Sequence, residues 1–252
     1  MRLWRAWLTL VWLSFRRLLW SANTLMILFP LSGGALFLLR RRYDRMEDVE
    51  AAFNMFSNFL IFIFASFMIP ICALAYGTAS VGGDREDQTL LFLLVRPIAR
   101  PLILLAKFVA TLPLAVGLVA ATFFLYCRLA GEPGALAYQL FLPTILCMTL
   151  AYVGLFHLFA VAWRHATIIA MVYAIFMELL LGNLPGIIKR IAVNYYGRSL
   201  MYAAGASEGL SRPEWFEPIS SSAATWALAG IAGGSLLLAM LVFERREYRD
   251  LT

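Results

Sequence analysis

The chain has 252 residues, of which 62 % are hydrophobic and 14 % are charged, with a net charge of +6. A soluble domain carries about 25 % charged residues, so this composition excludes an ordinary globular protein, which would lack the polar surface to cover such a core. The mean hydropathy of +0.78 indicates a lipid bilayer as the solvent. The basic residues are spread over many loops, which suits contact with anionic lipid and argues against nucleic acid as a partner.

The residues that precede the first long apolar run are amphipathic at helical spacing. Arg2, Arg5 and Arg16 fall on one face, and Trp7 and Leu10 fall on the other. Basic residues opposite aromatics and leucines predict an amino-terminal interfacial helix that lies in the membrane surface. The alternative is a plain helical extension of the first span.

Six apolar runs are long enough to cross the roughly 30 Å hydrocarbon core, which needs about 20 helical residues. They cover residues 18–39, 53–79, 102–127, 138–163, 166–184 and 223–243. We therefore predict an all-α integral membrane protein with six transmembrane helices, in which residues 1–252 form a single domain. An even number of spans places both termini on one side. The lysine and arginine count favours a cytoplasmic amino terminus only slightly, because Arg40–Arg42 oppose it.

A charged segment interrupts the apolar pattern between the second and third runs, and we call residues 84–96 the acidic insert. Gly82-Gly83 is expected to end the second span, and Asp84 is suited to cap a new helix. Glu86 and Asp87 would lie in its first turn, where the helix dipole favours anions. Pro97 then stops a helix of about a dozen residues, which is too short to cross a membrane.

The second half of the acidic insert, residues 90–95, is apolar on every side. Such a helix should be covered on more than one side, by the membrane domain and by a partner. The whole stretch DREDQTLLFLLVRPIARPLILLAK, residues 84–107, resembles the signature of the type-2 permease family of ATP-binding-cassette exporters. The matching residues are Glu86, Thr89, Leu90, Pro97, Arg100 and Lys107. Gln88 stands where that family usually has glycine, and Leu91 where an acidic residue often sits.

The resemblance implies that the acidic insert is a cytoplasmic coupling helix, which docks on a separate ATPase subunit. The residues expected to form this contact are Asp84, Glu86, Asp87, Thr89, Leu90, Phe92 and Leu93. The family further implies an exporter in the bacterial cytoplasmic (inner) membrane with both termini cytoplasmic. It implies two copies of the ATPase and a second permease copy or a paralogue as partners.

Signatures of membrane enzymes and of nucleotide binding are absent from the sequence. There is no HExxH and no GxSxG, and neither Lys107 nor Lys189 follows a glycine, so the chain has no P-loop. We therefore expect that this chain is not an enzyme and binds no cofactor. ATP and Mg would be bound by the partner ATPase. Cys72, Cys127 and Cys147 all lie in apolar runs without a CxxC, and we interpret them as core residues.

Two polar residues inside the predicted spans are candidates for a translocation path. Glu178 is the only carboxylate inside a span, and a lone carboxylate there is costly unless it is paired or hydrated. The alternative places Glu178 near the outer interface, where it satisfies backbone N–H groups freed by the Asn183–Gly186 break. His157, in the fourth span, is either part of the same path or a hydrogen-bonded core histidine.

The longest connection, residues 185–222, is not plainly polar. Apolar residues alternate with basic ones, and Tyr195, Tyr202 and Trp215 supply interfacial aromatics. We predict one or two short outer-face helices before the sixth span.

Two classes of function remain open from the sequence. The first is a permease that carries cargo, for which the scarcity of polar groups in the spans favours an amphiphile. The second is a mechanotransmitting or scaffold subunit that drives an extracytoplasmic partner and carries no cargo. A polar cavity on the dimer axis would favour the first, and a sealed apolar axis the second.

Overall fold

The computed structural model describes residues 2–21, 24, 48–86, 98–183 and 186–246, and every element within them is a helix. The prediction of an all-α protein is therefore confirmed for the described residues. In the labels below, η marks π-helices and 3-10 helices. In chain order the elements are α1 (Arg2–Leu19), α3 (Val49–Leu60), η2 (Ile61–Met68), α4 (Ile69–Glu86), α6 (Arg100–Ala130), α7 (Glu132–Ala162), α8 (Ala166–Tyr173), η3 (Ala174–Leu180), η4 (Leu181–Asn183), η5 (Ile188–Ile191), α9 (Val193–Gly205), η6 (Ala206–Glu208) and α10 (Ser221–Arg245).

Four helices in the described part of the chain are long and apolar enough to cross a membrane. They are Val49–Arg85, Arg100–Ala130, Glu132–Ala162 and Ser221–Arg245. These correspond to the second, third, fourth and sixth predicted spans. The fifth run contains a shorter apolar helix, Ala166–Glu178, and the first run lies mostly outside the described residues. Six spans therefore remain a prediction.

The long helices exceed the thickness of a bilayer. The continuous helix through α3, η2 and α4 has 37 residues, and α6 and α7 have 31 each. At 1.5 Å per residue they extend about 46–56 Å, compared with roughly 30 Å of hydrocarbon. Their ends therefore project into the headgroups or the water on at least one side.

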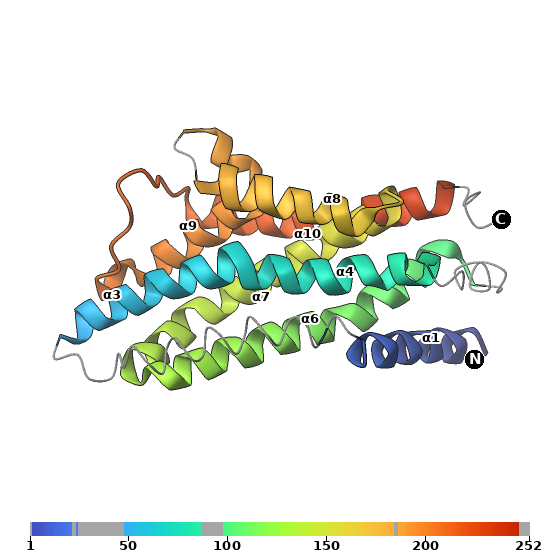
Figure 1. Cartoon of the computed structure of the whole chain (residues 1–252), viewed down its shortest axis with the longest axis horizontal. Coiled ribbons are helices and arrows are strands. Elements are labelled where there is room, and N and C mark those ends of the chain that lie inside the picture. Colours follow the sequence, from blue (N-terminus) through green and yellow to red (C-terminus); the bar gives the residue numbers. More distant parts are fainter. Residues whose placement is uncertain (1, 22–23, 25–47, 87–97, 184–185, 247–252) are drawn as a thin grey trace.

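Helix α7 occupies the centre of the bundle and packs against α3, α4, α6, α8, α9 and α10 (Figure 1). Two glycines allow this packing. A Cβ on Gly77 of α4 would lie 2.9 Å from Phe156 Cβ, and one on Gly154 of α7 would lie 2.9 Å from the carbonyl oxygen of Ala232. Small residues at such crossings let helix backbones approach closely, as is common between membrane helices.

Both ends of the described chain lie at one end of the bundle, together with the last turn of α4 and the first turn of α6 (Figure 1). The hairpin between α6 and α7 and the start of α3 lie at the opposite end. This hairpin turns at Gly131, whose φ of 74° is in the left-handed region that favours glycine. The arrangement agrees with an even number of membrane crossings.

Helix α1 packs against the first turns of α6. Trp7 Nε1 donates a hydrogen bond to the carbonyl oxygen of Leu102 at 3.0 Å, and Leu10 is buried. Trp4 and Trp12 are 64 % and 62 % exposed. In Figure 1 the helix runs along the long axis of the bundle and not across its end. This orientation does not confirm the predicted helix in the membrane surface, which would cross the bundle steeply.

Short helices precede α10, as the sequence predicts. They are η5, α9 and η6, and most of α9 is buried against the bundle. Two cations pack on aromatic rings here, since Lys189 Nζ lies 5.4 Å and Arg198 Cζ 4.8 Å from the ring centre of Phe216. Burial lowers the pKa of the Arg198 guanidinium, mainly because the charge is removed from water.

Candidate functional site

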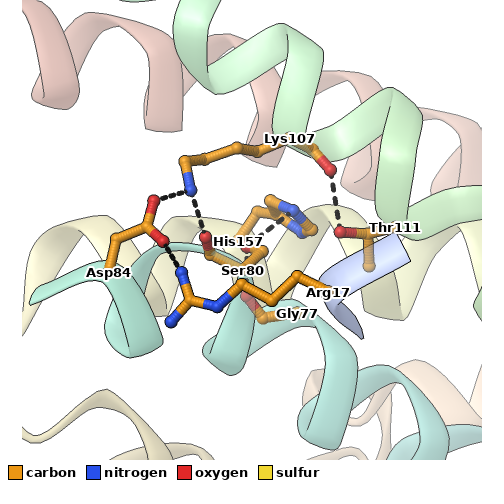
Figure 2. A network of polar contacts seen from close by, with 7 residues as sticks. All are labelled: Arg17, Gly77, Ser80, Asp84, Lys107, Thr111 and His157. Atoms are coloured by element: carbon orange, nitrogen blue, oxygen red, sulfur yellow. Dashed lines mark hydrogen bonds and ion pairs between the residues drawn. The ribbon is translucent and has the colours of Figure 1, made fainter. Parts of the chain in front are cut away.

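Asp84 lies inside a helix and not at the start of a new one. Helix α4 continues through Gly82 and Gly83 to Glu86, so the predicted end of the second span at these glycines is wrong. The physical reason is that the Asp84 carboxylate is 5 % exposed and finds two cations on neighbouring helices. It pairs with Lys107 of α6 and with Arg17 of α1 (Figure 2). The continued helix thus places the carboxylate where these charges are.

Lys107 is nearly inaccessible to solvent, at 2 % exposure. Its Nζ donates to one Asp84 oxygen and, at 2.6 Å, to the carbonyl oxygen of Ser80 (Figure 2). A buried ammonium group needs such partners, because removing it from water costs several kcal/mol. The last turns of α4 also carry the negative end of the helix dipole, which favours a cation.

His157 joins this cluster from α7. Its Nδ1 lies 2.8 Å from the carbonyl oxygen of Val153, and its Nε2 lies 3.0 Å from Ser80 Oγ. A carbonyl can only accept, so Nδ1 donates to Val153. The single proton of the Ser80 hydroxyl is within reach of both Nε2 and the carbonyl oxygen of Gly77, which lies 2.8 Å from Oγ. His157 is fully buried, and Phe108 packs edge-on against it. Its contacts are those of a hydrogen-bonded core histidine, and its assignment to a translocation path stays a prediction.

Ser80 therefore connects three helices. Its carbonyl oxygen accepts from Lys107 of α6 and its hydroxyl meets His157 of α7, while Asp84, one turn later in α4, adds Arg17 of α1. We call Arg17, Ser80, Asp84, Lys107 and His157 the charge cluster. It fixes the end of α4 to α1, α6 and α7.

Two arginines, one near the start of the acidic insert and one just after it, close the ends of other helices. Arg85 Nη1 donates to the carbonyl oxygen of Trp163 at 2.9 Å, just beyond the end of α7. Arg100 Nη1 lies 3.4 Å from the carbonyl oxygens of Glu244 and Arg246, at the end of α10. Carbonyls at helix C-termini lack intrahelical partners, and cations there are favoured by the dipole. Arg85 and Arg100 therefore both hold the bundle together at this end.

The residues predicted to contact an ATPase lie largely beyond the described part of the chain. Asp84 is buried in the charge cluster and Glu86 is the last residue of α4. Asp87, Thr89, Leu90, Phe92 and Leu93 lie outside the described residues. Their role as a coupling helix stays a prediction.

Glu178 lies in the π-helix η3, fully buried. Its Oε1 accepts from the backbone N–H of Val193 at 3.0 Å and from the Tyr173 hydroxyl at 2.8 Å. Its Oε2 accepts from the backbone N–H of Asn194 at 2.9 Å. Val193 and Asn194 begin α9, so the carboxylate satisfies free N–H groups at a helix N-terminus. The second alternative from the sequence expected such N–H groups at the Asn183–Gly186 break, and the observed donors lie further along the chain. A place in a translocation path stays a prediction for Glu178 too.

Two π-helical segments meet at this carboxylate. The Asn194 side chain donates to the carbonyl oxygen of Glu178 in η3 at 3.0 Å and to Ser66 Oγ in η2 at 3.3 Å. The two π-helices also contact each other directly. Such segments are uncommon and are frequent at functional sites.

Sequence reasoning missed Arg17 and Ser80 and interpreted Lys107 only as a residue that matches the family signature. One signal was available. Lys107 falls inside the apolar run 102–127, where an ammonium group requires a carboxylate, and the nearest acidic residues before that run are Asp87, Glu86 and Asp84. The position of Arg17 depends on how α1 packs, which no local pattern specifies.

Comparison with known proteins matches nearly the whole chain to one family. Residues 9–247 match the family described as ABC-2 family transporter protein. A comparison with curated proteins found no match. The match covers both the charge cluster and the acidic insert, and it confirms the resemblance on which the sequence analysis relied. The chain therefore belongs to the ABC-2 family of transporter proteins.

Proposed function

We propose that the chain is the six-span permease subunit of an ATP-dependent exporter in the bacterial cytoplasmic membrane, with both termini cytoplasmic. Family membership implies an ABC ATPase as its partner. Because the chain has no P-loop, ATP and Mg are held by that ATPase and this subunit is not itself an enzyme. Two ATPase copies and a second permease, identical or paralogous, complete the transporter.

One observation carries the proposal, namely that the first residues of the acidic insert and Arg100, shortly after its end, are bound to the bundle. Asp84 binds α1 and α6, Arg85 binds the end of α7, and Arg100 binds the end of α10. Packed helix interiors are hard to compress, so a displacement of the insert is passed to these helices and is not absorbed locally. This is what a segment needs if it is to transmit the work of an ATPase.

The chemistry of the insert itself supports a docking role. Leu90, Phe92 and Leu93 supply apolar area of the kind found at the centre of interfaces, worth about 1.5–3 kcal/mol per fully buried side chain. Glu86 and Asp87 would lie at the polar rim, where single charges have less effect on affinity.

The test is co-purification of the permease with its ATPase. Phe92→Asp places an unpaired charge in the proposed contact, and we expect a loss of several kcal/mol of binding. The complex yield and the stimulation of ATP hydrolysis should therefore collapse, while the permease still inserts because residue 92 lies outside every predicted span. Glu86→Gln is the matched control and should leave the yield nearly unchanged. Normal yield and stimulation with Phe92→Asp would refute the coupling role.

A further inference from the structure

A groove of about 490 Å³ opens beside the last two turns of α10, at the end of the bundle where both termini lie (Figure 1). It is lined by Ala162, Leu238, Leu241, Val242, Arg245 and Arg246. The volume falls within the range of about 300–1,000 Å³ that is usual for small-molecule sites. None of the lining residues is acidic.

The lining residues form an apolar strip that ends at a guanidinium group. Leu238, Leu241 and Arg245 are spaced three and four residues apart, so they lie one above another on one face of α10. Leu238 and Leu241 are 49 % and 50 % exposed. Because α10 is long and apolar enough to span a membrane, the leucines belong to its hydrocarbon part and Arg245 to its boundary with water.

The two arginines of the groove have different partners. Arg246 Nη1 donates to the carbonyl oxygens of Val161 and Ala162, at 2.6 and 2.5 Å, and so closes the end of α7. Arg245 is exposed, and within the described residues its side chain has no hydrogen-bond or ion-pair partner. A guanidinium group carries five N–H donors in a fixed fork, which suits it to bind an anion.

We propose that this groove binds an anionic phospholipid, with the phosphate on Arg245 and an acyl chain along Leu238 and Leu241. A guanidinium group makes strong, often paired hydrogen bonds to phosphate oxygens. A small soluble anion would use only Arg245 and leave the leucine strip open, whereas a lipid satisfies both halves of the groove. Basic pockets beside membrane helices at the cytoplasmic surface are suited to such headgroups. The proposal does not depend on coupling to an ATPase.

The test is competition between phosphatidylglycerol and phosphatidylcholine, mixed in equal amounts, for the purified permease, with bound lipid counted by native mass spectrometry. We expect the unaltered protein to bind more phosphatidylglycerol than phosphatidylcholine. In Arg245→Gln the ratio of bound phosphatidylglycerol to bound phosphatidylcholine should fall about fivefold. Arg164→Gln removes an exposed arginine outside the groove and should keep it. Leu241→Gln should lower phosphatidylglycerol occupancy without a change of charge.

Three outcomes would overturn the proposal. The first is an unchanged preference in Arg245→Gln, and the second is an equal loss in Arg164→Gln, which would indicate general surface charge. The third is that Leu241→Gln has no effect and inorganic phosphate displaces the lipid, which would indicate a site for soluble anions that does not bind an acyl chain. Thermal unfolding of each variant, whose altered side chain is exposed, checks that the fold is intact.

Discussion

Lys107 lies inside an apolar helix, where its neighbours supply a carboxylate and a carbonyl oxygen to its amino group. Asp84 in turn accepts from both Lys107 and Arg17, so two cations share one carboxylate. The two pairs differ in exposure, since the Lys107 side chain is 3 % exposed and that of Arg17 is 45 % exposed. Exposed pairs contribute about 0–1 kcal/mol, whereas breaking a buried pair costs about 3–5 kcal/mol.

This difference predicts a graded series of variants. Asp84→Ala leaves the Lys107 ammonium buried without its anion and should lower the free energy of unfolding by about 3–5 kcal/mol. Arg17→Gln should cost at most about 1 kcal/mol. The double variant Asp84→Ala/Lys107→Met removes both buried charges and should recover most of the loss. Thermal unfolding of the purified permease measures all three. Equal damage from Arg17→Gln and Asp84→Ala would contradict this account of the cluster.

At the scale of elements, length and hydropathy were sufficient to find the four long helices. Their ends were harder to place. Glycines such as Gly82 and Gly83 usually weaken a helix, yet here the ion pairs of Asp84 hold the helix past them. The π-helices η2 and η3 could not be predicted, because nothing in their composition differs from an ordinary apolar helix. The partners of Glu178 come from residues 193 and 194, and only the folded chain brings them together.

The contact between α7 and α10 offers a matched pair of glycines. A Cβ on Gly154 would meet the carbonyl oxygen of Ala232 at 2.9 Å, whereas one on Gly230 of α10 would have nothing within 4 Å. Gly154→Ala should therefore force the helices apart and cost about 1–3 kcal/mol. Gly230→Ala should be neutral or stabilise by up to about 1 kcal/mol. Thermal unfolding in detergent compares them, and a neutral Gly154→Ala would show that α10 packs differently.

At the scale of the whole molecule, several of the charged groups described above gather at one end. The charge cluster, the arginines that close α7 and α10, and both ends of the described chain all lie there (Figure 1). The hairpin of α6 and α7 lies at the other end. We expect the first end to face the cytoplasm, where positive residues concentrate.

Cysteine labelling in sealed vesicles tests this orientation. Cys72 and Cys127 are buried and Cys147 is exposed. The variant Cys147→Ser therefore removes the exposed native thiol that would otherwise react with the label. Arg164→Cys and Thr89→Cys should react with an impermeant maleimide only from the cytoplasmic side, and Glu132→Cys, in the hairpin, only from the opposite side. Reaction of Thr89→Cys from the extracytoplasmic side would refute both the orientation and the coupling role.

The π-helix η2 affects how the face of each residue in this span should be assigned. A π turn closes its hydrogen bond one residue later than an α turn, so each such turn holds an extra residue. One residue corresponds to a rotation of about 100° in an α-helix. A single helical wheel drawn from Val49 to Arg85 therefore assigns residues beyond Met68 to the wrong side. Shortening the chain by one residue within 61–68 would therefore let this stretch close ordinary α turns, with the two halves of the span facing nearly as they do now.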